Sequence, residues 1–322
     1  MAFLELIEFI TNTEMRCNVL AIALFSVVIW ACGGTSSTET KIGKVNVSAD
    51  ESLQPLMEAE EMVFEGLIKD VEVNLVFRPE DVSIGLMIND STRIAVVTRE
   101  LNAKEQDILK QNKQQVFTHK LATDAVALIT HPTNQDTLLT MSELKDLFLG
   151  KKSNWSELKG GNLSEKVVIV FDNNNSSNLS FISQKLGIPD KSKIPFFTAN
   201  SNKAVIDYVK KTPGALGVIG INWISDTDDP AAEKFIKGIN VLGLTEAENP
   251  TSVEEYSYPI PFYLKLERYP LRRNVYLLTK DVRNSFLNYV CKDKGQLVVL
   301  KAGLLPATDP VRMIHVTNKM PE

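Results

Sequence analysis

The stretch KVNVSADESLQPLMEAEEMVFE, residues 44–65, contains a strand followed at once by a helix. Its first five residues alternate apolar and polar side chains, which is the period of a half-buried strand. The oxygen-bearing side chains of 50–52 (DES) favour a helix start, and 53–65 then carries apolar residues at helical spacing. A strand that passes directly into a helix is the repeating unit of α/β folds.

The same alternation of strand and helix continues along the chain. Further strands are expected at 71–78, 94–98, 116–122, 125–130, 167–171, 216–221, 239–244 and 275–279, and further helices at 81–89, 101–112, 142–149, 176–185, 202–211, 282–291 and 294–302. This pattern predicts an α/β fold with mostly parallel sheets. A chain of 322 residues is long enough for two lobes, each with its own core.

Composition excludes several function classes. The 35 Lys and Arg against 40 Asp and Glu give a net charge of −5, which argues against a nucleic-acid partner. The three Cys and three His are scattered singly, so we expect no metal site and no cofactor. The chain also lacks the G-x-S-x-G, H-E-x-x-H and G-x-x-x-x-G-K-[ST] motifs, and we predict that it is not an enzyme.

The N-terminal segment indicates export and lipid anchoring. Residues 19–31 form a run of thirteen apolar or small residues behind Arg16, too short for a membrane-spanning helix but typical of a signal peptide. The run ends at Cys32 and a Gly/Thr/Ser-rich spacer, which resembles a bacterial lipoprotein signal. We therefore expect a signal peptide over 1–32, with Met15 as an alternative start, acylation of Cys32, and a flexible tether over 33–41. The alternative is an N-terminal membrane anchor with an incidental cysteine.

Three polar segments lie where a strand passes into a helix. They are 48–52 (SADES), Thr98-Arg99 and 175–178 (NSSN). The unpaired backbone N–H groups and the positive dipole end of a helix N-terminus suit an anion. The alternative is that all three are ordinary helix caps, because Ser, Thr, Asp and Asn are the favoured cap residues.

Colinear sequence blocks resemble the phosphate-binding substrate-binding proteins of ABC transporters, a type 2 periplasmic binding family. The resemblance covers about residues 43–318, and its most specific block is Phe148-Leu149-Gly150-Lys151 followed by Asn154-Trp155-Ser156-Glu157-Leu158. The other blocks are 97–101 with Glu105, 124–134, 139–144, 175–178, 213–220 and 269–276.

The resemblance implies two α/β lobes with an interlobe cleft, joined by two crossover strands. Lobe one is expected to comprise 42–124 plus 262–318, and lobe two 125–261. The crossovers are expected near Asp124 and near 259–262, where two prolines stiffen an otherwise extended segment.

The resemblance also implies the ligand contacts. Hydroxyl groups and backbone amides at the helix starts would donate hydrogen bonds, and Arg99 would supply the fixed charge. Asp50 would accept the proton of hydrogen phosphate, a bond that sulfate cannot form. The expected ligand-binding residues are Asp50, Ser52, Thr98, Arg99, Ser176, Ser177 and Asn178.

The function that follows is that of a monomeric, lipid-anchored protein of the bacterial cell envelope. It would capture inorganic phosphate on the periplasmic side of the membrane and deliver it to an ABC permease. The acidic pair Asp50-Glu51 and the loop 176–178 depart from the family pattern. An alternative is therefore a sensor or scaffold lipoprotein with the same fold, which binds another oxyanion, a small polar ligand, or none.

Overall fold

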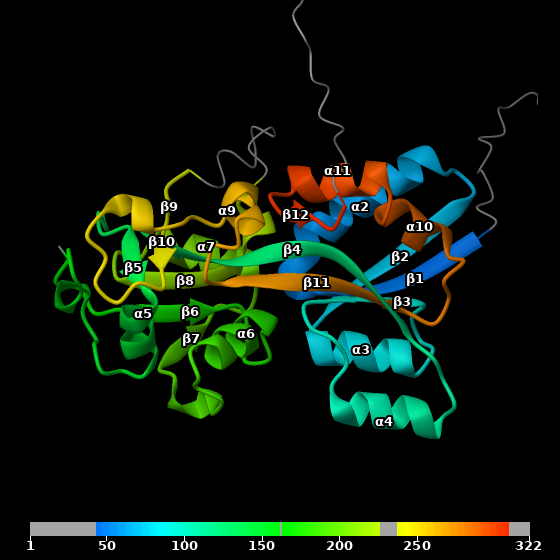
Figure 1. Ribbon diagram of the computed structural model, residues 1–322, viewed down its shortest axis with the longest axis horizontal. Helices are drawn as coiled ribbons and strands as arrows, with labels where there is room; N and C mark the ends of the chain where they lie inside the picture. Colours follow the sequence, from blue (N-terminus) through cyan, green and yellow to red (C-terminus); the bar gives the residue numbers. More distant parts are fainter. Residues whose placement is uncertain (1–42, 162, 226–236, 309–322) are drawn as a thin grey trace, which may run out of the picture. The chain divides into compact units, whose positions relative to one another are not determined.

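A ten-stranded mixed sheet runs through the part of the chain that the computed structural model describes, residues 43–161, 163–225 and 237–308. Its main path is β2-β1-β3-β11-β4-β8-β6-β7 (Figure 1). Strand β4 (Phe117–Thr130) pairs with β11 (Arg272–Thr279) up to Ala125 and with β8 (Ala215–Gly220) from Val126 onward. We call the part on the β11 side lobe one and the part on the β8 side lobe two.

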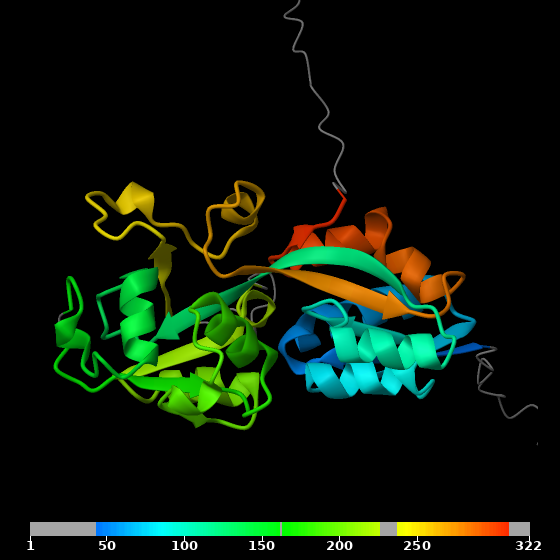
Figure 2. The same ribbon diagram turned by 60° about the horizontal axis from the view of Figure 1, so that its bottom comes forward.

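Lobe one is built on a parallel β2-β1-β3 sheet. Parallel neighbours require crossover connections, which α2 and α3 supply. Helices α2, α10 and α11 cover one face of this sheet, and α3 and α4 cover the other (Figures 1 and 2). Its elements are β1 (Gly43–Asp50), η2 (Glu51–Leu53), α2 (Gln54–Leu67), β2 (Val71–Arg78), α3 (Glu80–Ile88), β3 (Ile94–Val97), α4 (Ala103–Gln111), β11, α10 (Ser285–Val290), α11 (Asp293–Lys301) and β12 (Leu305–Pro306).

Lobe two repeats the parallel arrangement with β8-β6-β7. Its core includes Phe148, Phe171 and Phe196 in edge-to-face contact, a geometry that stabilises aromatic pairs. Its elements are β5 (Leu138–Thr140), α5 (Met141–Phe148), η3 (Trp155–Glu157), β6 (Val168–Phe171), α6 (Ser177–Lys185), η4 (Lys191–Lys193), β7 (Phe196–Thr198), α7 (Asn202–Val209), β8, η5 (Ile221–Trp223), β9 (Asn240–Val241), β10 (Gly243–Thr245), η6 (Val253–Glu255) and α9 (Pro261–Lys265).

The α/β, two-lobed prediction is confirmed, with four local corrections. The strands expected at 116–122 and 125–130 form one continuous strand, β4. The β2-β1-β3 and β8-β6-β7 parts of the sheet are parallel, but β4 and β11 pair antiparallel with their neighbours. The segment expected to be extended at 259–262 enters helix α9 at Pro261, because proline fits the first turn of a helix. The single strand expected at 239–244 is two short strands, β9 and β10, with different partners.

Two sequence predictions lie outside the described residues. The signal peptide over 1–32 with its acylated Cys32, and the tether over 33–41, are in the undescribed N-terminal unit of the chain. Among the helices of residues 43–308 that the structure describes, none has the length and apolar character required to cross a bilayer.

Candidate functional site

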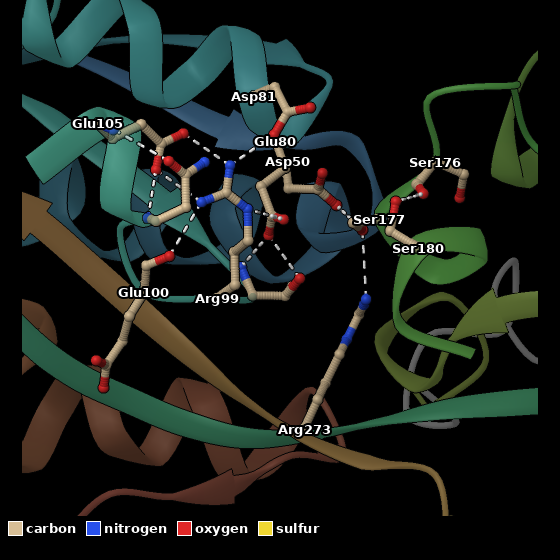
Figure 3. A network of polar contacts seen from close by, with 12 residues as sticks. Asp50, Glu80, Asp81, Arg99, Glu100, Glu105, Ser176, Ser177, Ser180 and Arg273 are labelled. Atoms are coloured by element: carbon tan, nitrogen blue, oxygen red, sulfur yellow. Dashed lines mark hydrogen bonds and ion pairs between the residues drawn. The ribbon is translucent and has the colours of Figure 1, made fainter. Parts of the chain in front are cut away.

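Asp50 lies at the end of β1 and accepts hydrogen bonds from both lobes. Its Oδ1 accepts the backbone N–H of Ser52 at 3.0 Å and the hydroxyl of Ser177 at 2.6 Å, and the Ser52 hydroxyl also donates to it. The two serine hydroxyl oxygens are 3.2 Å apart. Ser52 precedes α2 in lobe one and Ser177 begins α6 in lobe two, so two of the three predicted helix starts meet at one point. Figure 3 shows the contact of Ser177 with Asp50.

Arg273 of β11 supplies the positive charge at this point. Its guanidinium donates to the hydroxyl of Ser52 at 2.9 Å and to that of Ser177 at 3.3 Å. Only 5% of the residue is exposed. The side chain reaches Ser177 from the strands that join the lobes, on the side opposite Asp50 (Figure 3).

The pairing of β11 with β4 fixes the position of this arginine. Arg273 and Asp124 are direct partners in the antiparallel ladder, so their side chains lie on the same face of the sheet. The Arg273 Nε donates to Asp124 Oδ2 at 2.9 Å, and the guanidinium also lies 5.9 Å from the centre of the Phe181 ring. Burial raises the pKa of Asp124, and the neighbouring Arg273 opposes that shift. Asp124 thus orients the guanidinium toward the two serines.

Arg99, expected to contact the ligand, has carboxylate partners in lobe one. Its guanidinium bonds both oxygens of Glu105 at 2.8 and 2.9 Å, Asp81 at 2.6 Å and Glu80 at 3.1 Å (Figure 3). The hydrogen bonds that Arg99 donates to Glu105 are the main reason that the pKa of Arg99 is raised. The expected arginine is therefore held by α3 and α4, while Arg273 contacts the two serines.

Thr98 belongs to the network of Arg99. Its backbone N–H and its hydroxyl both donate to Glu80 Oε2 at 2.6 Å. Glu80 is buried at the start of α3, and burial followed by the charge of Asp50 raises its pKa. Thr98 therefore shares Glu80 with Arg99, in the network that α3 and α4 hold within lobe one.

The other two predicted residues flank Ser177 in lobe two. The Ser176 hydroxyl caps α6 by accepting the N–H of Leu179 at 3.5 Å. Asn178 is fully buried, and within the described residues neither its Oδ1 nor its Nδ2 has a hydrogen-bond partner. Leaving a buried amide unsatisfied costs about 1–3 kcal/mol, so such a group is expected to have a partner in the working protein.

Two further carboxylates meet between the lobes at the side chain of Asn173. The amide Nδ2 donates to Glu51 Oε2 of lobe one at 2.8 Å and to Asp172 Oδ2 of lobe two at 3.2 Å. Asp172 is 2% exposed. Burial raises its pKa to about 6, with a smaller contribution from the charge of Asp50. Burial and Asp50 likewise raise the pKa of Glu51.

The backbone carbonyl of Ser52 is a second point of contact between the lobes. It accepts the Asn222 Nδ2 at 2.9 Å and the Trp223 Nε1 at 3.1 Å, both from η5 of lobe two. A Cβ at Gly220 would lie 2.9 Å from the same carbonyl oxygen. Glycine at this position therefore allows the two backbones to approach.

The arrangement provides hydroxyl donors from two helix starts and a fixed arginine between them, with a carboxylate acceptor facing it. Hydroxyl and guanidinium groups recognise the oxygen atoms of an oxyanion, and arginine does so in a planar geometry. Within the described residues, no group of three or more His, Cys, Asp and Glu side chains could hold a metal ion.

Of the predicted residues, the structure brings Asp50, Ser52 and Ser177 together. The sequence analysis did not propose the residues that surround them, which are Arg273, Asp124 and Asn173. Arg273 lies in the sequence block 269–276 that carries the family resemblance, and it shares every second position of the strand with the apolar Leu271 and Val275. That alternation was the available signal, because it places one arginine of the Arg272-Arg273 pair on the buried face.

Two α/β lobes that share crossing strands and meet around a buried arginine define the class of two-lobed solute-binding proteins. The chain belongs to the PBP superfamily, whose family model matches residues 34–294.

Individual relatives of the chain agree with this membership. Phosphate-binding protein PstS of Bacillus subtilis strain 168 is 24% identical over 310 residues, which cover 90% of this chain and 93% of that protein. The protein of the same name from Staphylococcus epidermidis RP62A is 22% identical over 278 residues, covering 84% and 82%.

Solved structures show the same fold. A Clostridium perfringens protein with bound phosphate, assigned as a phosphate ABC transporter substrate-binding protein, superposes with a TM-score of 0.68 at 20% identity. The match covers 82% of this chain and all of that one. An ABC-type phosphate transport receptor of Vibrio cholerae gives 0.58 at 18% identity, over 82% and 99%.

Proposed function

We propose that this protein binds inorganic phosphate between its lobes and delivers it to an ABC permease, with no chemistry of its own. The observation that carries the proposal is the contact of Arg273 with Ser52 of one lobe and Ser177 of the other. An oxyanion placed against these three side chains would hold both lobes at once. The relatives named as phosphate-binding proteins support phosphate as that anion.

Phosphate rather than sulfate is the better match for the acceptor in the site. Asp50 is a buried carboxylate that accepts three hydrogen bonds. A carboxylate and an oxyanion are both acceptors, so they can form a hydrogen bond only if one of them carries a proton. Phosphate carries such a proton near neutral pH and sulfate does not. An unpaired acceptor facing sulfate would cost several kcal/mol, enough for a discrimination of about a thousandfold or more.

Calorimetry on the full-length protein in detergent tests this proposal. Phosphate is expected to bind with one site per chain, and sulfate at the same concentration is expected to give no heat beyond dilution. Equal binding of both anions would contradict the assigned role of Asp50. Absence of phosphate binding would favour the alternative, a sensor or scaffold lipoprotein with the same fold. The carboxylates around Arg273 are the observation that supports that alternative.

We further propose that Cys32 is acylated and anchors the protein to the membrane at the cell envelope. Two or three acyl chains would anchor the protein stably, because each buried CH₂ contributes about 0.8 kcal/mol. Metabolic labelling with a fatty-acid analogue is expected to tag the wild type and not Cys32→Ala. Labelling that persists in Cys32→Ala would favour the alternative of an N-terminal membrane anchor with an incidental cysteine.

A further inference from the structure

Carboxylates from the two lobes share a single side-chain amide beside the proposed phosphate site. Asn173 Nδ2 donates to Glu51 Oε2 at 2.8 Å and to Asp172 Oδ2 at 3.2 Å. Both carboxylates are thus within hydrogen-bond distance of one nitrogen. Like charges this close disfavour each other's ionised form.

The surroundings of this pair are mostly acidic. Asp50 acts on both carboxylates, and the exposed Arg78 acts on Glu51. Beyond Asp50 lie Asp124 with Arg273, and Glu80 with Arg99. Arg273, the single buried arginine of the described site, bonds Asp124, while Asp50 adds negative charge near both Glu51 and Asp172.

Asp172 also has one carboxylate oxygen with no partner at hydrogen-bond geometry in the described chain, although the nearby Ser176 hydroxyl lowers its pKa in part. Its Oδ2 accepts the Asn202 Nδ2 at 3.3 Å in addition to Asn173, but its Oδ1 is buried without a hydrogen-bond partner. A carboxylate with one unsatisfied buried oxygen gains a position for a proton. Burial accordingly raises the pKa of Asp172 to about 6.

An anion bound among these groups must raise their affinity for protons. A negative charge on the ligand disfavours the ionised form of each neighbouring carboxylate. Anion binding and proton binding are therefore linked, and the linkage is reciprocal. A doubly charged ligand would face the full repulsion, whereas a singly charged ligand accompanied by a proton would leave the net charge of the site unchanged.

We infer that the site takes phosphate as the singly charged dihydrogen ion together with one proton, which the Glu51–Asp172 pair takes up from solvent. The inference rests on the proposed function, namely that phosphate is the ligand. It makes Glu51 and Asp172 specificity-determining residues, because they select the charge state of the anion while Arg273 and the serines bind its oxygens.

The sign of the pH dependence follows from the linkage. Below about pH 6 the pair already holds its proton and the affinity for phosphate is at its full value. Above that pH the proton must be taken up on binding, so the dissociation constant rises by up to about tenfold per pH unit. Phosphate loses its own second proton in the same range, and only a comparison of variants separates the two effects.

Calorimetry of phosphate binding to the full-length protein, in two buffers of different ionisation enthalpy at about pH 7, counts the protons taken up. The informative variants are Asp172→Asn and, should that protein fail to fold, Glu51→Gln at the half-buried partner. Asp136→Asn is the matched control, because Asp136 is also buried with a pKa of about 6 but has Glu143 as its charged neighbour.

The variants are expected to take up fewer protons than the wild type and to bind phosphate about tenfold more tightly at about pH 8. Asp136→Asn is expected to match the wild type. Phosphate binding with unchanged proton uptake in both Asp172→Asn and Glu51→Gln would overturn the inference and leave the proposed function intact. Failure of the wild type to bind phosphate at any pH would refute the proposed function, and the inference with it.

Discussion

Arg99 and Arg273 both lie beside buried carboxylates, but they have different kinds of partner. Arg99 is held by Glu80, Asp81 and Glu105, all from lobe one. Arg273 has one carboxylate, Asp124, and two serine hydroxyls that belong to different lobes. A hydroxyl partner can be exchanged for an anion oxygen at little cost, whereas a carboxylate partner would have to leave the arginine first. From this comparison we expect Arg273 to bind the ligand and Arg99 to support the structure of lobe one.

The largest effect is expected from removing the charge of Arg273. Charge-assisted hydrogen bonds contribute about 1.5–3 kcal/mol each, so Arg273→Gln should weaken phosphate binding by about two to three orders of magnitude. Arg273→Lys should recover only part, because a point charge lacks the planar geometry. The adjacent Arg272→Gln is the control, since Arg272 pairs with Glu267 at the surface. Calorimetry measures the affinity of each variant. An equal loss of phosphate affinity in Arg273→Gln and Arg272→Gln would contradict a ligand-binding role that belongs to Arg273.

Arg99→Gln is expected to act on stability instead of binding. The substitution leaves the buried Glu80 without its cationic partner, which should lower the free energy of unfolding by about 1–3 kcal/mol. Phosphate affinity should stay within about twofold of the wild type, because no bond to the ligand is removed. Urea titration and calorimetry on the same sample measure the two quantities. A tenfold loss of phosphate affinity with unchanged stability would instead indicate that Arg99 contacts the ligand.

The hydrogen-bond network of Arg273 includes residues of both lobes, whereas that of Arg99 includes residues of lobe one. Gly220→Ala should separate the networks, because the new Cβ would lie 2.9 Å from the Ser52 carbonyl oxygen of the opposite lobe. Overpacking of this kind costs about 1–3 kcal/mol, so phosphate affinity should fall about tenfold. Gly66→Ala in α2 is the control, since a Cβ there meets no atom within 4 Å. Unchanged phosphate affinity in Gly220→Ala would mean that binding does not need the close contact between Gly220 and Ser52.

Glu60 is a buried carboxylate that, unlike Glu80 and Asp124, has no arginine partner in the described chain. Burial raises its pKa to about 9, above its ordinary value of 4.5. Stability is therefore complete below the ordinary value and is lost as pH rises toward 9, by up to about 1.4 kcal/mol per pH unit. Glu60→Gln should flatten this dependence, and Glu58→Gln on the exposed face of α2 should not. Parallel pH–stability curves for wild type and Glu60→Gln would contradict the assignment.

The sequence predicts those features of this site that depend on local chemistry. The strand ending before 50–52 and the serines of 175–178 are visible as strand-to-helix junctions, and the structure brings Ser52 and Ser177 within 3.2 Å. Helix caps and alternation are local signals, which is why these positions can be read from one chain.

The choice between the two arginines could not be made in the same way. Arg99 follows a predicted strand, as an anion-binding residue would, but Glu80 lies 19 positions before it and is brought to it only by the packing of α3. Arg273 and Asp124 are 149 residues apart, and only the register of β11 against β4 makes them partners. Sheet register between distant strands depends on tertiary packing, which one sequence does not reveal.

A crystal structure of the protein grown with phosphate tests the central claim most directly. The account predicts a tetrahedral anion within hydrogen-bond distance of the Arg273 guanidinium and of the hydroxyls of Ser52 and Ser177, with Arg99 still bound to Glu80 and Glu105. Phosphate bound to Arg99, or to one lobe without Arg273, would contradict it.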